Sequence, residues 1–337
     1  MRPNPEGLLH NHIDGSLAVG DVIMDLYRDA GKKFPFRNLH MFLAHMRDRS
    51  LPIWQRFQPV TGILQTAEAL EQLGYAYGKR RKQEGKKHAE GKFAPQYSCG
   101  EGSELTIETA TDAMIRGLRM AEKDFGITLY PHVCIGREAE PETGIEVARA
   151  ALKYDGECAL DLACDEKDNP PEKHLAAYRL TFGSNVKREC HAGENEDKSE
   201  GELGYRLRLT RNMLTAIFEL KCHGISHCIP LADHLTTAMD CNDKNLVDYI
   251  AEQNIRVTMC PLSNFEEGHI SSIRELGIDE LLDRGVLLTL DDDDDLIFPP
   301  LSEVLDACEA VYHFTPEQAK ALEDNVFKGT FDNRVRT

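Results

Sequence analysis

The beginning of the chain combines apolar residues with two histidines at a spacing that suits metal binding. Residues 8–16 run from two leucines into His10 and His12, and continue through Asp14 to a glycine and a serine. In a β-strand, residues two apart point to the same side, so both imidazoles would leave the strand in one direction. Paired imidazoles provide the first ligands for a divalent metal ion, although two surface histidines near a terminus would give the same pattern. The rest of the chain must supply the remaining ligands.

Three later strand-like segments end in residues of the same kinds. They contribute His191, with Glu194 close behind it, His227, and a run of five aspartates at 291–295. Taken singly, each histidine would be a strand-end residue bonded to backbone, and an aspartate run would be a solvated loop. Here the aspartates follow an apolar run, where so much like charge is costly unless a cation neutralises it. Together these strand ends predict a mononuclear zinc site with three nitrogen ligands, one oxygen ligand and an open position for water.

The pattern of apolar runs predicts the frame that holds these residues. Strand-like runs lie at residues 8–12, 88–93, 128–135, 158–163, 186–191, 225–229, 256–262 and 286–290. Between them, apolar residues at helical spacing predict helices at residues 109–125, 144–153, 203–222, 245–253 and 273–283. Alternating strands and helices imply parallel strands, and eight of them imply an α/β fold, the closed (β/α)8 TIM barrel. In such a barrel the carboxyl ends of all strands meet at one rim, where active sites lie.

The interval at 17–87 is too long for one helix and predicts extra helices inserted after the first strand, a natural lid. We expect a single barrel domain over residues 1–337, because no repeat or low-complexity linker divides the chain. The alternative architecture is an open doubly wound sheet. It is disfavoured because no G-x-G-x-x-G motif follows any of the strands.

Charge and composition narrow the classes of partner. With 39 basic and 57 acidic side chains the formal net charge is −18, which repels nucleic-acid backbones and anionic membranes and favours a small-molecule substrate. No segment approaches the ~18 apolar residues of a membrane helix, and residues 1–7 carry no apolar signal region, so we expect a cytoplasmic protein. Ten cysteines occur without a C-x-x-C pair, which indicates free thiols in a reducing compartment.

The combined motifs resemble the adenosine deaminase family of the amidohydrolase superfamily, and the resemblance runs in order over nearly the whole chain. The matching segments are HNHIDGS at 10–16, LQT at 64–66, FAPQ at 93–96, DLA at 161–163, HAGE at 191–194, ISH at 225–227, CPLSN at 260–264 and the aspartate pair at 293–294. The resemblance implies a zinc-dependent hydrolase, with one Zn2+ per chain, that deaminates adenosine or 2′-deoxyadenosine to the inosine forms and ammonia.

The resemblance also implies roles for individual residues in the reaction. Glu194 would protonate N1 of the purine as water adds at C6, and His227 would orient that water and help to deprotonate it. Glu194 must hold a proton for this step; burial would raise its pKa while a metal ion would lower it. Zinc lowers the pKa of water toward neutrality. The implied zinc ligands are His10, His12, His191 and Asp293.

Other residues would bind the substrate. By the same resemblance, Asp294 would contact N7 and the attacking water, and Asp14 together with His12 would meet the ribose 5′-hydroxyl. Cys164 stands where the family has a glycine whose backbone N–H reaches N3. Relatives that act on free adenine tend to have glutamate at the position of Asp14, where it fills the space of the missing ribose.

Several positions depart from the family pattern. The family has a small residue, two aspartates and a proline where this chain has 292–295, so the position of the aspartate pair is ambiguous. The position of Phe298 places the pair at 293–294, and a shift by one residue is the alternative. A cysteine at position 164 adds a side chain beside the purine edge. Other departures are Asn11, Ser226 and Cys228.

These departures leave the substrate open. The alternatives to adenosine are adenine and another modified aminopurine nucleoside. A hypothesis from a different class is a catalytically inactive barrel that binds a purine. The sequence leaves the oligomeric state and the identity of the divalent metal ion open.

Overall fold

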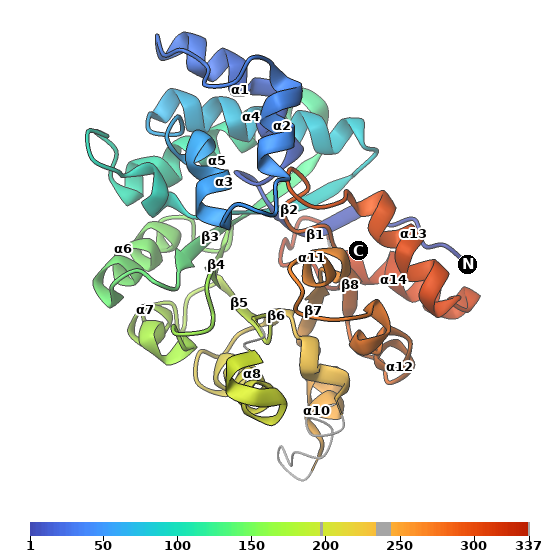
Figure 1. The fold of residues 1–337 in the computed structure, drawn as a ribbon. Helices are drawn as coiled ribbons and strands as arrows, with labels where there is room; N and C mark the ends of the chain where they lie inside the picture. Colours follow the sequence, from blue (N-terminus) through green and yellow to red (C-terminus); the bar gives the residue numbers. More distant parts are fainter. Residues whose placement is uncertain (196–197, 234–243, 336–337) are drawn as a thin grey trace.

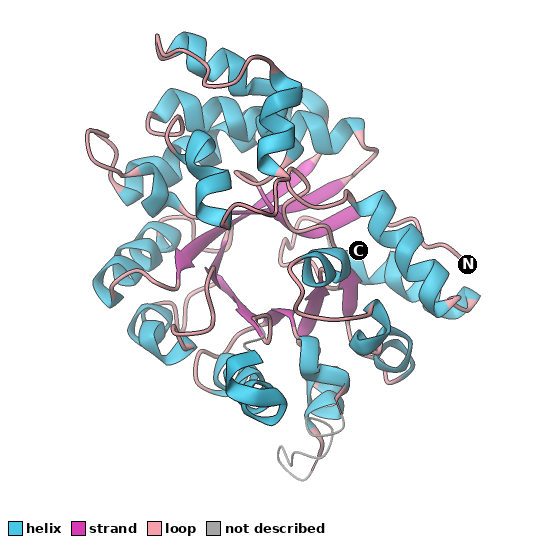
Figure 2. Cartoon of the chain, viewed as in Figure 1, coloured by secondary structure: helices cyan, strands magenta, loops and turns pink. Residues whose placement is uncertain are grey.

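A computed structural model of the chain describes residues 1–195, 198–233 and 244–335. Eight parallel strands form a sheet in sequential order, and Figures 1 and 2 show them as a ring with the helices outside it. The predicted (β/α)8 barrel is therefore confirmed. The strands are β1 (Gly7–His12), β2 (His88–Phe93), β3 (Thr128–Gly136), β4 (Ala159–Ala163), β5 (Lys187–Ala192), β6 (Gly224–His227), β7 (Arg256–Met259) and β8 (Leu288–Leu290).

The helices alternate with the strands, and four of them form the predicted insertion between β1 and β2. These are α1 (Leu17–Asp29), α2 (Leu39–Met46), α3 (Ile53–Thr61) and α4 (Ala67–Gln83). The other helices are α5 (Ile107–Phe125), α6 (Pro141–Leu152), α7 (Leu175–Leu180), α8 (Gly201–Phe218), α10 (Leu246–Glu252), α11 (Pro261–Glu266), α12 (Ile278–Asp283), α13 (Leu301–Tyr312) and α14 (Pro316–Lys328). Among the described residues, no helix is long and apolar enough to cross a membrane.

Two predicted elements differ from the observed ones for local reasons. The helix predicted at 273–283 is divided into a 3₁₀ turn, η5 (Ile273–Leu276), and α12, because Gly277 between them adopts φ +57°. A Cβ at Gly277 would lie 2.4 Å from Cβ of Ala232, so glycine is needed there. The strand predicted at 256–262 ends at Met259, and Pro261 instead begins α11, the helix position that proline favours.

Residues of the HNH segment at 10–12 and of the aspartate run close the barrel between its last and first strands. An isolated parallel bridge pairs Asn11 with Asp293. The backbone N–H of His12 donates to the Asp293 carbonyl at 2.9 Å, and that of Asp293 donates to the His10 carbonyl at 3.3 Å. The backbone contacts that complete the barrel therefore also fix the two histidines of β1 relative to Asp293.

The interior of the barrel below the rim is filled by charged side chains in addition to apolar ones. Lys92 donates to Asp161 at 2.7 Å and to Glu189 at 2.8 Å, and all three side chains are fully buried. Arg256 bonds Glu189 at 2.7 Å, and His132 lies 3.0 Å from the same carboxylate. The ammonium of Lys92 and the guanidinium of Arg256 thus neutralise the carboxylates, and His132 is part of this buried network.

Each carboxylate of the aspartate run, apart from the two that face the rim, has its own buried partners. Asp291 accepts two backbone N–H groups of β1 at 2.8 and 3.0 Å. Asn11 donates to Asp292 at 3.0 Å and to Asp295 at 3.2 Å. Arg81, which α4 brings from the insertion, bonds Asp295 at 2.9 Å and lies 3.8 Å from Asp292. Two departures from the family pattern, Asn11 and Asp292, therefore compensate each other.

We expect Arg81→Met to lower the free energy of unfolding by about 3–5 kcal/mol, because it leaves buried carboxylates without their cation. The Arg81 side chain is 1% exposed, whereas its neighbour Arg80 is 25% exposed and bonds Asp21 at the surface. Arg80→Met is the matched control and should cost under about 1 kcal/mol. Urea denaturation of both variants measures the difference, and equal losses would contradict the assigned role of the buried pair.

Candidate active site

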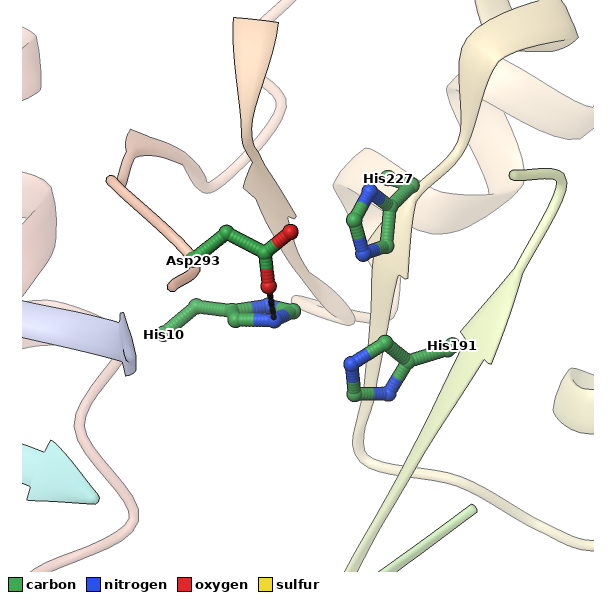
Figure 3. Close-up of side chains that lie close together, drawn as sticks. All are labelled: His10, His191, His227 and Asp293. Atoms are coloured by element: carbon green, nitrogen blue, oxygen red, sulfur yellow. Dashed lines mark ion pairs between the residues drawn. The ribbon is translucent and has the colours of Figure 1, made fainter. Parts of the chain in front are cut away.

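Four side chains from different strands meet at the carboxyl-terminal rim of the barrel. Figure 3 shows His10, His191, His227 and Asp293 pointing toward one another, and one nitrogen or oxygen atom of each lies within 4.8 Å of the others. His10 Nε2 lies 3.3 Å from Asp293 Oδ1, and the three imidazole centroids are 4.6, 5.1 and 5.2 Å apart. All four residues are buried. The fold thus brings together residues that are separated by up to 283 positions in the sequence.

His12 joins this cluster from its solvent side. Its Nε2 atom lies 3.2 Å from Nε2 of His191 and 3.4 Å from Oδ1 of Asp293. His12 also forms an overlapping group with Asp293 and Asp294. His12 therefore approaches His191 and Asp293, whereas the group that brings His10, His191 and Asp293 together contains His227 in place of His12.

The backbone at the rim holds strained conformations where the functional side chains emerge. His227 has φ +67° and Cys228 has φ +52°, and Asp293 has φ +61°. Residues other than glycine avoid this left-handed region, and such strain concentrates at functional sites. The positive φ at 228 is a conformation that favours glycine, and β6 ends at His227 instead of continuing to 229.

Hydrogen bonds to the outer ring nitrogens orient the histidines. When Nδ1 of a histidine is engaged in this way, Nε2 is directed toward the centre of the site. Two of the residues that make these bonds, Thr258 and Asn264, were not predicted from the sequence. Asn264 lies in the CPLSN motif at 260–264, whereas no motif includes Thr258. The pairs are His10 with Thr258 Oγ1 at 3.0 Å, His191 with Asp161 Oδ1 at 3.3 Å and His227 with Asn264 Nδ2 at 3.0 Å.

The donor set fits a divalent metal ion. The Nε2 atoms of His10 and His227 are buried, and within the described part of the chain neither has a hydrogen-bond partner. Buried polar atoms without partners are costly, so their convergence on one carboxylate fits a site that binds a cation. Imidazole nitrogens with one aspartate oxygen are typical ligands of zinc.

The protonation states also suit metal binding. Burial lowers the pKa of His12 to about 4 and that of His227 to about 3, and it lowers the pKa of His10 well below its ordinary value. Burial opposes ionisation of Asp293, but the close approach of the His10 imidazole and of the neighbouring imidazoles holds its pKa well below the ordinary value. At neutral pH these shifts favour neutral imidazoles at His10, His12 and His227 and an ionised carboxylate at Asp293, the forms that bind metal ions.

Glu194 lies directly beside the cluster, in the loop after β5. Its Oε1 atom is 3.5 Å from Nε2 of His227, and the side chain is 17% exposed. Burial raises the pKa of Glu194 well above its ordinary value, and the negative charge of Asp293 adds to the increase. The carboxyl group can therefore hold a proton at neutral pH and donate it, as a general acid does.

Asp14 and Asp294 lie at the mouth of the barrel on the β1 side. Burial raises the pKa of Asp14 to about 6 and the pKa of Asp294 well above its ordinary value, and Asp14 contributes to the second increase. A Cβ at Gly15 would lie 1.5 Å from Oδ1 of Asp294, so the glycine leaves the space that this carboxyl occupies. The two side chains thus share one part of the rim, next to His12.

Cys164 occupies the end of β4 in a conformation that favours glycine. Its φ is +79°, which explains why relatives have glycine at this position. The sulfur lies 3.3 Å from the Tyr97 hydroxyl, and that hydroxyl also bonds Glu138. The added side chain therefore contacts the loops after β2 and β3.

Comparisons with known proteins identify the family of this chain. The family model described as "Adenosine deaminase" matches residues 5–336. The adenine deaminase of Schizosaccharomyces pombe is 30% identical over 310 residues, which are 88% of this chain and 78% of that protein. The crystal structure of an adenine deaminase from Arthrobacter aurescens superposes with a TM-score of 0.80 at 22% identity, covering 98% of this chain and 94% of that one. A Burkholderia ambifaria amidohydrolase with bound Zn has a TM-score of 0.78 at 21% identity, covering 98% and 87%. The chain belongs to the adenosine deaminase family.

Proposed function

We propose that this chain catalyses the hydrolytic deamination of a 6-aminopurine, with adenosine or 2′-deoxyadenosine as its substrate. The observation that carries the proposal is the protonatable Glu194 lying 3.5 Å from His227 at the edge of the histidine–aspartate cluster. Two relatives act on the same purine ring, since both are named adenine deaminase. The reaction consumes one water molecule and releases ammonia and the 6-oxopurine.

We propose further that one zinc ion per chain is held by His10, His12, His191 and Asp293. The unpartnered nitrogen of His10 and the ionised state of Asp293 support this assignment, and so does the bound Zn of the Burkholderia ambifaria protein. A zinc ion in this place would make water a nucleophile at neutral pH by lowering its pKa.

The protein groups then account for the proton transfers. Addition of water at C6 moves an electron pair onto N1, and the carboxyl of Glu194 would give its proton to that atom. His227, whose low pKa leaves it neutral, would accept the proton that the attacking water loses. The raised pKa of Asp294 favours its protonated form, which would donate a hydrogen bond to N7. Collapse of the tetrahedral carbon would move the proton from His227 to the amino group, which leaves as ammonia, and the proton lost by the C6 hydroxyl would restore the acid form of Glu194.

The choice between nucleoside and free base depends on Asp14. This half-buried residue lies at the mouth of the site, where relatives that act on adenine tend to carry the longer glutamate. The shorter side chain would leave room for a ribose and accept its 5′-hydroxyl. Free adenine is the second candidate, because the relatives from Schizosaccharomyces pombe and Arthrobacter aurescens are named for it.

A substrate panel tests the proposal. We expect ammonia release from adenosine and 2′-deoxyadenosine, weaker ammonia release from adenine, and weaker formation of inosine and methylamine from N6-methyladenosine. Asp14→Glu should shift the ratio of kcat/KM for adenine over adenosine upward by about tenfold, the scale on which one methylene discriminates substrates. Asp29→Glu, at the exposed end of α1, is the matched control and should leave the ratio unchanged.

The panel also separates the alternatives. Turnover of adenine alone would contradict the nucleoside assignment and favour the second candidate. Preference for N6-methyladenosine would indicate a modified nucleoside as the substrate. Purine binding without turnover, by a protein that contains no zinc, would favour the inactive barrel.

A further inference from the structure

A buried carboxylate lies directly beneath the loop that carries Glu194. Glu166 is 1% exposed, and its Oε1 atom accepts the backbone N–H of Gly193 at 2.9 Å. Its Oε2 atom accepts the N–H groups of Glu194 at 2.7 Å and of Asn195 at 3.2 Å. Three successive N–H groups directed at one anion form a nest, which here includes a glycine with φ +83°. The turn after β5 is therefore shaped around this carboxylate.

Two further groups hold Glu166 in place. The side-chain amide of Asn212, on α8, donates to Oε1 at 2.9 Å. The guanidinium of Arg137 lies 4.0 Å from the same oxygen, and it also donates to the backbone carbonyl of His191. Glu166 is thus charge-compensated, and its four accepted hydrogen bonds leave little freedom for the loop.

The position of Glu166 in the chain connects two sides of the site. It lies two residues after Cys164, in the loop that follows β4, whereas the backbone it binds follows β5. In the proposed function Cys164 and Glu194 face N3 and N1 of the same purine ring. The Glu166 carboxylate therefore links the loop after β4 to the loop after β5. The purine ring must fit between these two loops.

We propose that Glu166 is a positioning residue that fixes the Glu194 carboxyl in line with His227 and with the purine N1. This inference rests on the proposed function. It requires no contact between Glu166 and the substrate. Both carboxylate oxygens must accept hydrogen bonds, because the three backbone N–H groups and the Asn212 amide are all donors. Glutamine has the same shape but would turn an N–H2 group toward those donors.

Glu166→Gln is the direct test. We expect kcat for adenosine to fall about 10- to 100-fold, the cost of a small misplacement of a catalytic group, while KM and zinc content remain near the wild-type values. Asn212→Asp should also lower kcat, because it places a second carboxylate against Glu166. The double variant Glu166→Gln, Asn212→Asp should recover most of the lost kcat, because the new carboxylate accepts from the new amide.

Asp332→Asn is the matched control for loss of a buried carboxylate. Asp332 is 2% exposed and bonds Arg334 in the segment after α14, remote from Glu194. We expect this variant to lose thermal stability and keep its kcat. The proposal is overturned by an unchanged kcat in Glu166→Gln, and equally by a loss of kcat that follows zinc content or melting temperature and that the double variant does not recover. Absence of turnover in the wild-type protein would instead overturn the proposed function, and the inference with it.

Discussion

Glu194→Gln should lower kcat by about 10²- to 10⁴-fold, the contribution of a general acid, while the protein still binds zinc. Glutamine preserves the size of the side chain but has no acidic proton to give to N1. Burial and the charge of Asp293 raise the pKa of Glu194, so its carboxyl can hold a proton at neutral pH. The Glu194→Gln substitution removes this proton. Steady-state kinetics together with metal analysis measure the two properties separately.

The matched control is Glu219→Gln, at the exposed C-terminal end of α8, which should leave both turnover and zinc content unchanged. Two outcomes would contradict the assigned role of Glu194. Near-normal turnover of the variant would mean that another group protonates the purine. Loss of zinc together with turnover would mean that Glu194 maintains the metal site instead of supplying a proton.

His191→Ala should weaken zinc binding by more than about 100-fold, because loss of a residue that only orients a ligand already costs 10- to 100-fold. Nε2 of His191 lies 3.2 Å from Nε2 of His12, and its Nδ1 is held by Asp161 at 3.3 Å. Alanine leaves three of the four proposed ligands and a void beside them. Turnover should fall with the metal content.

Thermal denaturation gives a second measure of the same variant. A metal ion that binds only the folded state stabilises it by RT ln(1 + [metal]/Kd). A chelator should therefore lower the melting temperature of the wild type but not that of His191→Ala. His313→Ala, an exposed position after α13, should behave like the wild type. Full zinc occupancy in His191→Ala would remove this residue from the ligand set.

Local patterns were sufficient to predict the barrel and the rim positions of several key residues. The eight apolar runs correspond to β1–β8, and His10, His191 and His227 lie at or near the carboxyl ends of their strands, as predicted. This succeeds because alternation along a strand fixes which side chains share a face, and because parallel strands all end at one rim. The errors include element ends, such as that of the strand that Pro261 shortens, and one predicted helix that the positive φ of Gly277 divides.

What the sequence by itself determined, then, is the order of the elements and the residues that reach the rim. The tertiary structure decided which of the five aspartates faces the histidines: Asp293 does, through the bridge that closes the barrel at Asn11. It also showed that Arg81 and Asn11 hold the neighbouring carboxylates, and that Glu166 lies beneath Glu194. These pairings join residues from separate loops and helices. Their distances depend on how the helices pack around the closed barrel, which no local periodicity specifies.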